Sequence, residues 1–259
     1  MRPAIVLPLH DPEGIHLPRL IQFIPTLKIL FDRAIINIPP STRQAQPDIV
    51  RIFLTDPFFT NMACAESPVG EHFRLLYTFA AQATHPDQVL HLCYIDRLTF
   101  ILHTQYFQAF CDDIQSVTAS QTPLIFQRSS LAWDAHPRNY RDIEGMVTRA
   151  GEWLFHKSID FAWCHMAVQA GLLAEVLPRT RQTDLSIVTE MTLEMLESIH
   201  SIEVDWLAWE DPFILNRNPK ELKTERENSS SETCKRLAYV LPMLQLLYQH
   251  SLKQEAHVL

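Results

Sequence analysis

Residues 88–100 read QVLHLCYIDRLTF, and this stretch decides the fold class. An apolar run from Val89 to Ile95 has the length of a buried strand, and it ends abruptly at Asp96 and Arg97, where a helix-like pattern follows. In open α/β sheets, ligands bind beyond the carboxyl ends of the strands. Asp96 is therefore either a binding residue or a capping residue of the helix that follows.

Short apolar runs and amphipathic segments alternate over most of the chain. Strands are predicted at residues 3–9, 34–38, 58–65, 88–95, 123–128 and 201–209. Helices are predicted at residues 17–31, 47–54, 68–83, 98–110, 138–156, 165–176, 184–199 and 234–252. Pro25 predicts a kink in the first helix. One helix between the first two strands predicts that they are parallel. The fold class is thus α/β, with a mostly parallel central sheet flanked by helices.

A polar stretch near the end of the chain, with three consecutive serines, is the clearest linker. We divide the chain into an α/β domain at residues 1–215, a polar linker at 216–233 and a C-terminal amphipathic helix at 234–259. The helix is expected to dock on the body. It is also a candidate for self-association, which predicts a homodimer.

Composition excludes several function classes. The 22 Lys and Arg against 30 Asp and Glu form no basic cluster, which argues against nucleic acid as a partner. With only 5 glycines, neither G-x-G-x-x-G nor a P-loop occurs. No apolar run approaches the ~18 residues of a membrane span. The 5 cysteines lack a C-x-x-C pair and predict reduced thiols in a cytoplasmic protein. Zinc and serine-hydrolase motifs are likewise missing from the sequence.

Polar residues follow three of the predicted strands. His10 and Asp11 end the first strand, Glu66 follows the third, and Asp96 with Arg97 ends the fourth. If the first and fourth strands run side by side in the same direction, their acidic ends converge on one crevice. The alternative is that each carboxylate only caps a turn or a helix.

Four segments, in this order, resemble the nucleotide-diphospho-sugar transferase (GT-A) superfamily, and within it a bacterial group of glycosyltransferase-like proteins. They are LPLHDPEGIHLPRL (7–20), ESPVGEHFRLLYTFAAQA (66–83), HLCYIDRLTF (91–100) and FQRSSLAWDAHPRNYRDIE (126–144). The resemblance spans about residues 3–212. It implies a nucleotide-sugar donor and an acceptor, with sugar transfer by an inverting displacement.

The resemblance also assigns roles to residues on the donor side. It implies that the donor is bound by Asp11, Glu66, Arg74, Asp96, Arg97 and Arg128. In GT-A enzymes a D-x-D motif holds Mg²⁺ or Mn²⁺ against the diphosphate, and Asp96 matches its second aspartate. Tyr94 replaces the first one. Either Asp96 and the phosphates hold the cation, or Arg97 or Arg74 neutralises the diphosphate without metal, or the activity is lost.

On the acceptor side, the resemblance matches Asp160 in SIDFAWCHMAVQAG (158–171) and places the catalytic base at Glu190. Trp163 or Cys164 stands where the group has a glycine, so a large side chain narrows the acceptor pocket. The alternative for Glu190 is a place on the solvated face of its helix. In DWLAWED (205–211), the tryptophans either stack on a sugar or pack in the core.

Two functions from different classes follow. The first is a glycosyltransferase that uses a nucleotide-diphosphate sugar. The second is a catalytically degenerate GT-A-like protein that acts as a binding or interaction module, which the Tyr94 replacement favours. A nucleotidyltransferase on a related fold would need a glycine-rich basic loop after the first strand, and HDPEGIHLPR holds one glycine.

Overall fold

The computed structural model describes the backbone of residues 2–258 and the side chains as far as residue 254. One sheet of seven strands has the order β3-β2-β1-β4-β6-β5-β7. The strands are β1 (Ala4–Pro8), β2 (Ala34–Asn37), β3 (Phe59–Met62), β4 (Val89–Cys93), β5 (Leu124–Arg128), β6 (His165–Gln169) and β7 (His200–Val204). Only β6 is antiparallel to its neighbours among these strands, so the predicted mostly parallel sheet is confirmed.

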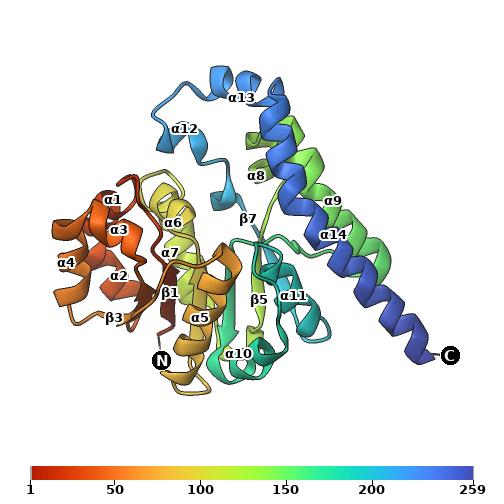
Figure 1. Cartoon of the computed structure of the whole chain (residues 1–259), viewed down its shortest axis with the longest axis horizontal. Helices are drawn as coiled ribbons and strands as arrows, with labels where there is room; N and C mark the ends of the chain where they lie inside the picture. Colours follow the sequence, from red (N-terminus) through yellow and green to blue (C-terminus); the bar gives the residue numbers. More distant parts are fainter. Residues whose placement is uncertain (1, 259) are drawn as a thin grey trace.

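Helices cover both faces of the sheet (Figure 1). They are α1 (Leu17–Ile21), α2 (Ile24–Leu30), α3 (Pro40–Ala45), α4 (Pro47–Thr55), α5 (Val69–Gln82), α6 (Ile95–Leu102), α7 (Phe107–Ser116), α8 (Ser130–Ala135), α9 (Arg138–Phe155), α10 (Ala170–Val176), α11 (Ile187–Glu194), α12 (Asp211–Ile214), α13 (Pro219–Glu227) and α14 (Ser230–Val258). Along the described chain, no helix combines the length and the apolar character needed to cross a membrane.

The strand sequences place one hydrophobic core on each face, because successive side chains point to opposite sides. In β1, Ile5 and Leu7 face the core under α1, α2, α4, α6 and α7. Ala4 and Val6 face the core under α5, α9, α10, α11 and α14. β1 and β4 are adjacent and parallel, with Val6 opposite Leu92. The prediction that the first and fourth strands run side by side in the same direction is therefore confirmed.

The C-terminal helix is longer than predicted. α14 packs along α9, and the two helices form an arm that extends from the body (Figure 1). α14 also packs on the core through Val240, Met243 and Leu247. The stretch 216–233, interpreted as a linker, holds α13 and the first turn of α14. Asn218 starts α13 by accepting hydrogen bonds from the backbone N–H groups of Lys220 and Glu221.

Several predicted elements need correction. Residues 165–176 are not one helix, because β6 occupies the first five and α10 the rest. The predicted helix at 98–110 starts earlier, at Ile95, and is two helices, α6 and α7. The helix at 17–31 is interrupted rather than kinked, since α2 begins at Ile24 with Pro25 in its first turn.

Candidate functional site

A cavity of about 450 Å³ opens at the carboxyl ends of β1 and β4. Strand ends, the first turn of α6, the segment before β6 and the start of α14 all contribute to its wall. Its charged and histidine lining residues are His10, His16, Asp96, Arg97, Glu144, Glu210, Asp211, Lys235 and Arg236. This is the position where ligands bind in open α/β sheets.

Asp96 lies in this wall, in the first turn of α6. The residue at the N-cap position is Tyr94, and its side chain makes no capping hydrogen bond. Asp96 accepts one hydrogen bond through Oδ1, from the backbone N–H of Arg97 at 2.8 Å. Oδ1 of Asp96 thus serves the start of the helix, as the capping alternative predicted. Asp96 is nevertheless also a lining residue of the cavity. Tyr94 also lines it and packs on Phe73, with ring centroids 5.0 Å apart.

Arg97 and Glu210 form an ion pair in the same wall. Arg97 also donates to the carbonyl oxygen of Ala208 at 3.2 Å. Burial disfavours the charge on Arg97, but Glu210, Asp96 and other neighbouring groups together outweigh it and raise the pKa of the guanidinium. Burial raises the pKa of Glu210 to about 7 against the pull of Arg97, with help from the charges of Asp96 and Asp211. A carboxyl group with a pKa near neutrality can accept a proton at working pH.

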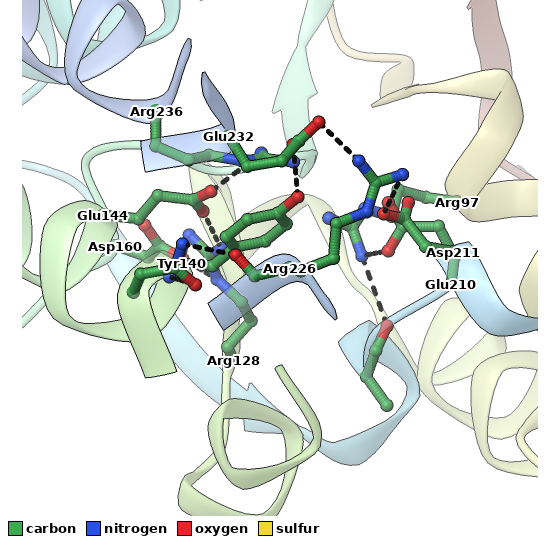
Figure 2. Close-up of polar contacts among 12 residues, drawn as sticks. Arg97, Arg128, Tyr140, Glu144, Asp160, Glu210, Asp211, Arg226, Glu232 and Arg236 are labelled. Carbon is green, nitrogen blue, oxygen red and sulfur yellow. Dashed lines mark hydrogen bonds and ion pairs between the residues drawn. The ribbon is translucent and has the colours of Figure 1, made fainter. Parts of the chain in front are cut away.

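A second group of charged side chains joins β5, α9 and α14 (Figure 2). Arg128, at the end of β5, donates to Asp160 at 2.9 Å and to Glu144 at 2.6 Å. Glu144 also accepts a hydrogen bond from Arg236 of α14 at 3.0 Å. Burial opposes the ionisation of Glu144, but the two arginines outweigh it and lower its pKa to about 2. Glu144 and Arg236 line the cavity, and Arg128 holds Glu144 from behind.

The network continues across α13 and α14. Tyr140 donates its hydroxyl to Glu232 at 2.5 Å, and Glu232 also pairs with Arg226. The guanidinium of Arg236 lies 3.8 Å from the ring centroid of Tyr140. Figure 2 shows that these side chains bridge the region between Glu144 and Asp211. The start of α14 is thus anchored to α9 by several charged contacts.

The other predicted donor residues lie outside the cavity lining. The buried carboxylate of Asp11 accepts hydrogen bonds from the backbone N–H groups of Ile15, His16 and Leu17, at 2.8 to 2.9 Å. Glu66 is exposed and accepts the backbone N–H of Ser41 at 2.6 Å. Arg74 is half-buried on α5, and its Nε has no hydrogen-bond partner. Asp11 thus shapes the loop that carries His16 into the wall.

The two predicted acceptor-side carboxylates also lie outside the lining. Asp160 is buried, bonded to Arg128, and accepts the backbone N–H of Ala162 at 3.0 Å. Glu190 accepts the backbone N–H groups of Arg181 and Gln182 at 2.7 and 2.9 Å. In these contacts both carboxylates hold loop backbone in place by accepting its N–H groups. Trp163, in contrast, lines the cavity.

Oxygen donors of the cavity suit a hard cation such as Mg²⁺ or Mn²⁺. Three carboxylates of the lining, Asp96, Glu210 and Asp211, come from two chain segments. They lie close together, because the charges of Asp96 and Asp211 help to raise the pKa of Glu210. Among the described residues, the one group of three metal-ligand types whose atoms lie within 4.8 Å of one another is His91, Cys93 and His165. That group is buried in the core between β4 and β6. A cation at the cavity would therefore need ligands from a bound phosphate as well as Asp96.

No family model matches the chain, and no curated protein sequence matches it. The structure is similar to crystal structures of glucosyl-3-phosphoglycerate synthase from Mycobacterium tuberculosis. With the complex containing Mn²⁺, UDP-glucose and phosphoglyceric acid, the TM-score is 0.52 at 11% identity, over 94% of this chain and 80% of that chain. With the UDP complex the TM-score is 0.51 at 11% identity, over 94% and 80%. The fold is of the GT-A type.

A third structure of that synthase, with Mn²⁺, UDP and phosphoglyceric acid, gives a TM-score of 0.50 at 12% identity over 94% of this chain and 78% of that chain. The predicted GT-A-like fold is thus confirmed. The sequence assigned no role to Glu210 and Asp211, or to Lys235, Arg236 and Tyr239 of α14, all of which line the cavity. The acidic pair after two tryptophans was the available signal for the first two. The α14 residues gave none, because their place in the wall depends on how the helix docks.

Proposed function

We propose that this chain binds a nucleotide-diphosphate sugar in the cavity at the ends of β1 and β4 and transfers the sugar to an acceptor. The observation that supports it most is the place of Asp96, a carboxylate in the cavity wall at the strand end of a GT-A-type sheet. The GT-A-type synthase of similar fold has been crystallised with Mn²⁺ and UDP-glucose.

In this proposal Asp96 and the diphosphate oxygens hold Mg²⁺ or Mn²⁺, which would stabilise the charge on the leaving diphosphate. Arg97, in the same wall, adds positive charge near Asp96. Glu210 takes the proton of the acceptor hydroxyl, because its pKa of about 7 lets the carboxylate form and accept a proton near neutrality. This assignment moves the proposed base from Glu190 or Asp160 to a residue that lines the cavity.

Thermal shift measurements test donor binding. We expect UDP or GDP with Mn²⁺ to raise the melting temperature of the protein, and we expect Asp96→Ala to abolish the rise. Asp48→Ala is the matched control, since the Asp48 side chain is 88% exposed on α4. The absence of any shift with either nucleotide, with or without Mn²⁺ or Mg²⁺, would contradict donor binding.

Tyr94 supports a second candidate function, a degenerate GT-A-like protein that binds a partner without catalysis. Its phenol ring stands in the cavity wall where the resemblance places a charged ligand. Hydrolysis of UDP-glucose separates the two candidates. Turnover above background that is lost in Glu210→Gln supports the transferase, and nucleotide binding without turnover supports the module.

A further inference from the structure

One side of the cavity is lined by carbon. Its residues are Phe73, Trp163, Leu185, Val188, Val240 and Met243. All six belong to the hydrophobic core on the α5 side of the sheet or pack against it. This side of the cavity therefore borders one continuous apolar cluster. Val240 and Met243 of α14 contribute to this side, and because they are only 1% and 4% exposed, a small part of each side chain faces the cavity.

The apolar side has little capacity to bind polar groups. The indole Nε1–H of Trp163 already donates to the carbonyl oxygen of Val188 at 3.1 Å and to the hydroxyl of Thr192 at 3.0 Å. Trp163 is fully buried and held in place by these bonds. A hydroxyl or carboxylate placed against this side would lose its water without gaining a partner, which is unfavourable.

The arginines of the cavity are also committed. Arg97 pairs with Glu210, and Arg236 pairs with Glu144. A small polyanionic acceptor would have to displace one of these carboxylates to gain a bidentate contact. Lys235 lines the cavity at an exposed position and contributes a solvated point charge.

We propose that the apolar side is the acceptor subsite and takes the body of an aromatic or aliphatic alcohol, an inference that rests on the proposed transferase function. The acceptor oxygen forms the new bond to the anomeric carbon of the donor sugar. The bond from that carbon to the diphosphate oxygen breaks, and its electron pair leaves with the nucleoside diphosphate. The acceptor proton passes to Glu210. The apolar side holds the rest of the acceptor out of water.

Calorimetric titration with 2-naphthol, in the presence of saturating UDP and Mn²⁺, tests the subsite on the full chain. We expect saturable binding to the wild type and at least fivefold weaker binding to Met243→Gln, because the amide faces carbon in the pocket. Leu241→Gln is the control, since Leu241 is 59% exposed two residues away on the same helix. Val240→Thr, which replaces one methyl group of the same apolar side with a hydroxyl, is the second variant if Met243→Gln does not fold.

The outcomes separate this inference from the function beneath it. Loss of naphthol affinity in Met243→Gln, with UDP binding unchanged, supports the apolar subsite. UDP binding without 2-naphthol binding, or with 3-phosphoglycerate bound instead, overturns it and leaves the donor site standing. Naphthol affinity that is equal in Met243→Gln and Leu241→Gln also overturns it. The absence of UDP binding to the wild type overturns the transferase function itself.

Discussion

Arg97 and Glu210 are 113 residues apart in the chain, and their side chains form a buried ion pair in the wall of the cavity. The pair joins the first turn of α6 to the segment after β7, so it connects two parts of the sheet at the candidate site. Its carboxylate also has a pKa of about 7. One contact therefore bears on both the architecture and the chemistry.

Replacement of Glu210 by glutamine should separate these two contributions. Glu210→Gln keeps the shape and an oxygen that accepts from Arg97, but it cannot take a proton. We expect sugar transfer or donor hydrolysis to fall by about 10²–10⁴-fold, the usual effect of removing a general base. UDP affinity should change little. Glu210→Ala should also destabilise the fold by about 3–5 kcal/mol, because Arg97 then stays buried without its partner.

Steady-state rates and chemical unfolding check both statements. If Glu210→Gln retains full turnover, Glu210 is not the base. The pH profile gives a second readout. The rate should rise with pH through about 7 as Glu210 loses its proton, and this limb should be missing in Glu210→Gln.

Among the charged residues Arg128, Glu144, Asp160 and Arg236, we expect Arg128 to contribute most to the stability of the fold. Arg128→Met leaves the buried carboxylates of Asp160 and Glu144 without their main cation, and we expect a loss of about 3–5 kcal/mol in the free energy of unfolding. Arg138→Met is the control, because the Arg138 side chain is 77% exposed in its ion pair. Its effect should stay within about 0.5 kcal/mol. Urea unfolding at pH 7 measures both variants.

The same network predicts a dependence of stability on acid. The pKa of Glu144 in the folded protein, about 2, is below its ordinary value of 4.5. Its contribution to stability is therefore complete above pH 4.5 and is lost as the pH falls toward 2. In Arg128→Met this loss should be smaller, since the cation that lowers the pKa is gone. An unchanged acid slope would contradict the role given to Arg128.

The buried histidines of the core should make stability depend on pH at milder acidity. Burial lowers the pKa of His91 to about 3 and lowers that of His165 well below 6.5. Between those values and 6.5 the unfolded chain binds protons that the folded chain does not, so stability falls as the pH drops below 6.5. The slope of the unfolding free energy against pH measures this loss. His91→Gln should reduce that slope by about 1.4 kcal/mol per pH unit.

Unfolding free energies at several pH values between 6.5 and 4.5 give this slope. The control is His85→Gln, since His85 is an exposed residue in the loop before β4. Its slope should match that of the wild type. Equal slopes for the wild type and His91→Gln would show that His91 is protonated in the folded state, contrary to the burial argument.

Two glycines on α9 form a matched pair. A Cβ on Gly151 would overlap the ring of Phe161, whereas a Cβ on Gly145 would lie 3.1 Å from the flexible end of Arg149. We expect Gly151→Ala to destabilise the protein by about 1–3 kcal/mol through overpacking. Gly145→Ala should stabilise it by up to about 1 kcal/mol through helix propensity. Thermal melts of the two variants decide the sign.

Self-association through the C-terminal helix remains a prediction. Leu241, Tyr248 and Leu252 are exposed apolar residues on α14. Light scattering of the full chain over a range of concentrations should show twice the monomer mass, and Leu241→Ser with Tyr248→Ser should return it to the monomer. A wild-type mass that stays monomeric throughout would end the dimer hypothesis.

Most strands could be predicted from sequence because short apolar runs end at proline or charged residues. The strand β6 was missed for a physical reason. His165–Gln169 is buried on both faces and runs directly into α10, so its apolar residues show neither the alternation of a half-exposed strand nor a boundary. The antiparallel direction of β6 follows from tertiary pairing, which the local sequence does not encode.

The candidate site was only partly predictable. Asp96 could be found because it ends an apolar run. The residues that surround Asp96 are brought together by long-range contacts such as that between Arg97 and Glu210. No local sequence pattern shows such contacts. Asp160 and Glu190 match the family pattern in sequence, and in the structure their carboxylates bind backbone N–H groups. The choice among acidic residues required knowing which ones face the cavity.

The contribution of α14 to the cavity wall has a consequence for biosynthesis. Domains begin to fold on the ribosome from the N-terminal side. The sheet is complete once β7 has emerged, but Arg236, Val240 and Met243 emerge later. All seven strands can therefore leave the ribosome before the last wall of the pocket and the part of the core that α14 supplies are present. A premature stop codon before position 235 would remove one wall of the pocket and would also leave the core on the α5 side without Val240, Met243 and Leu247.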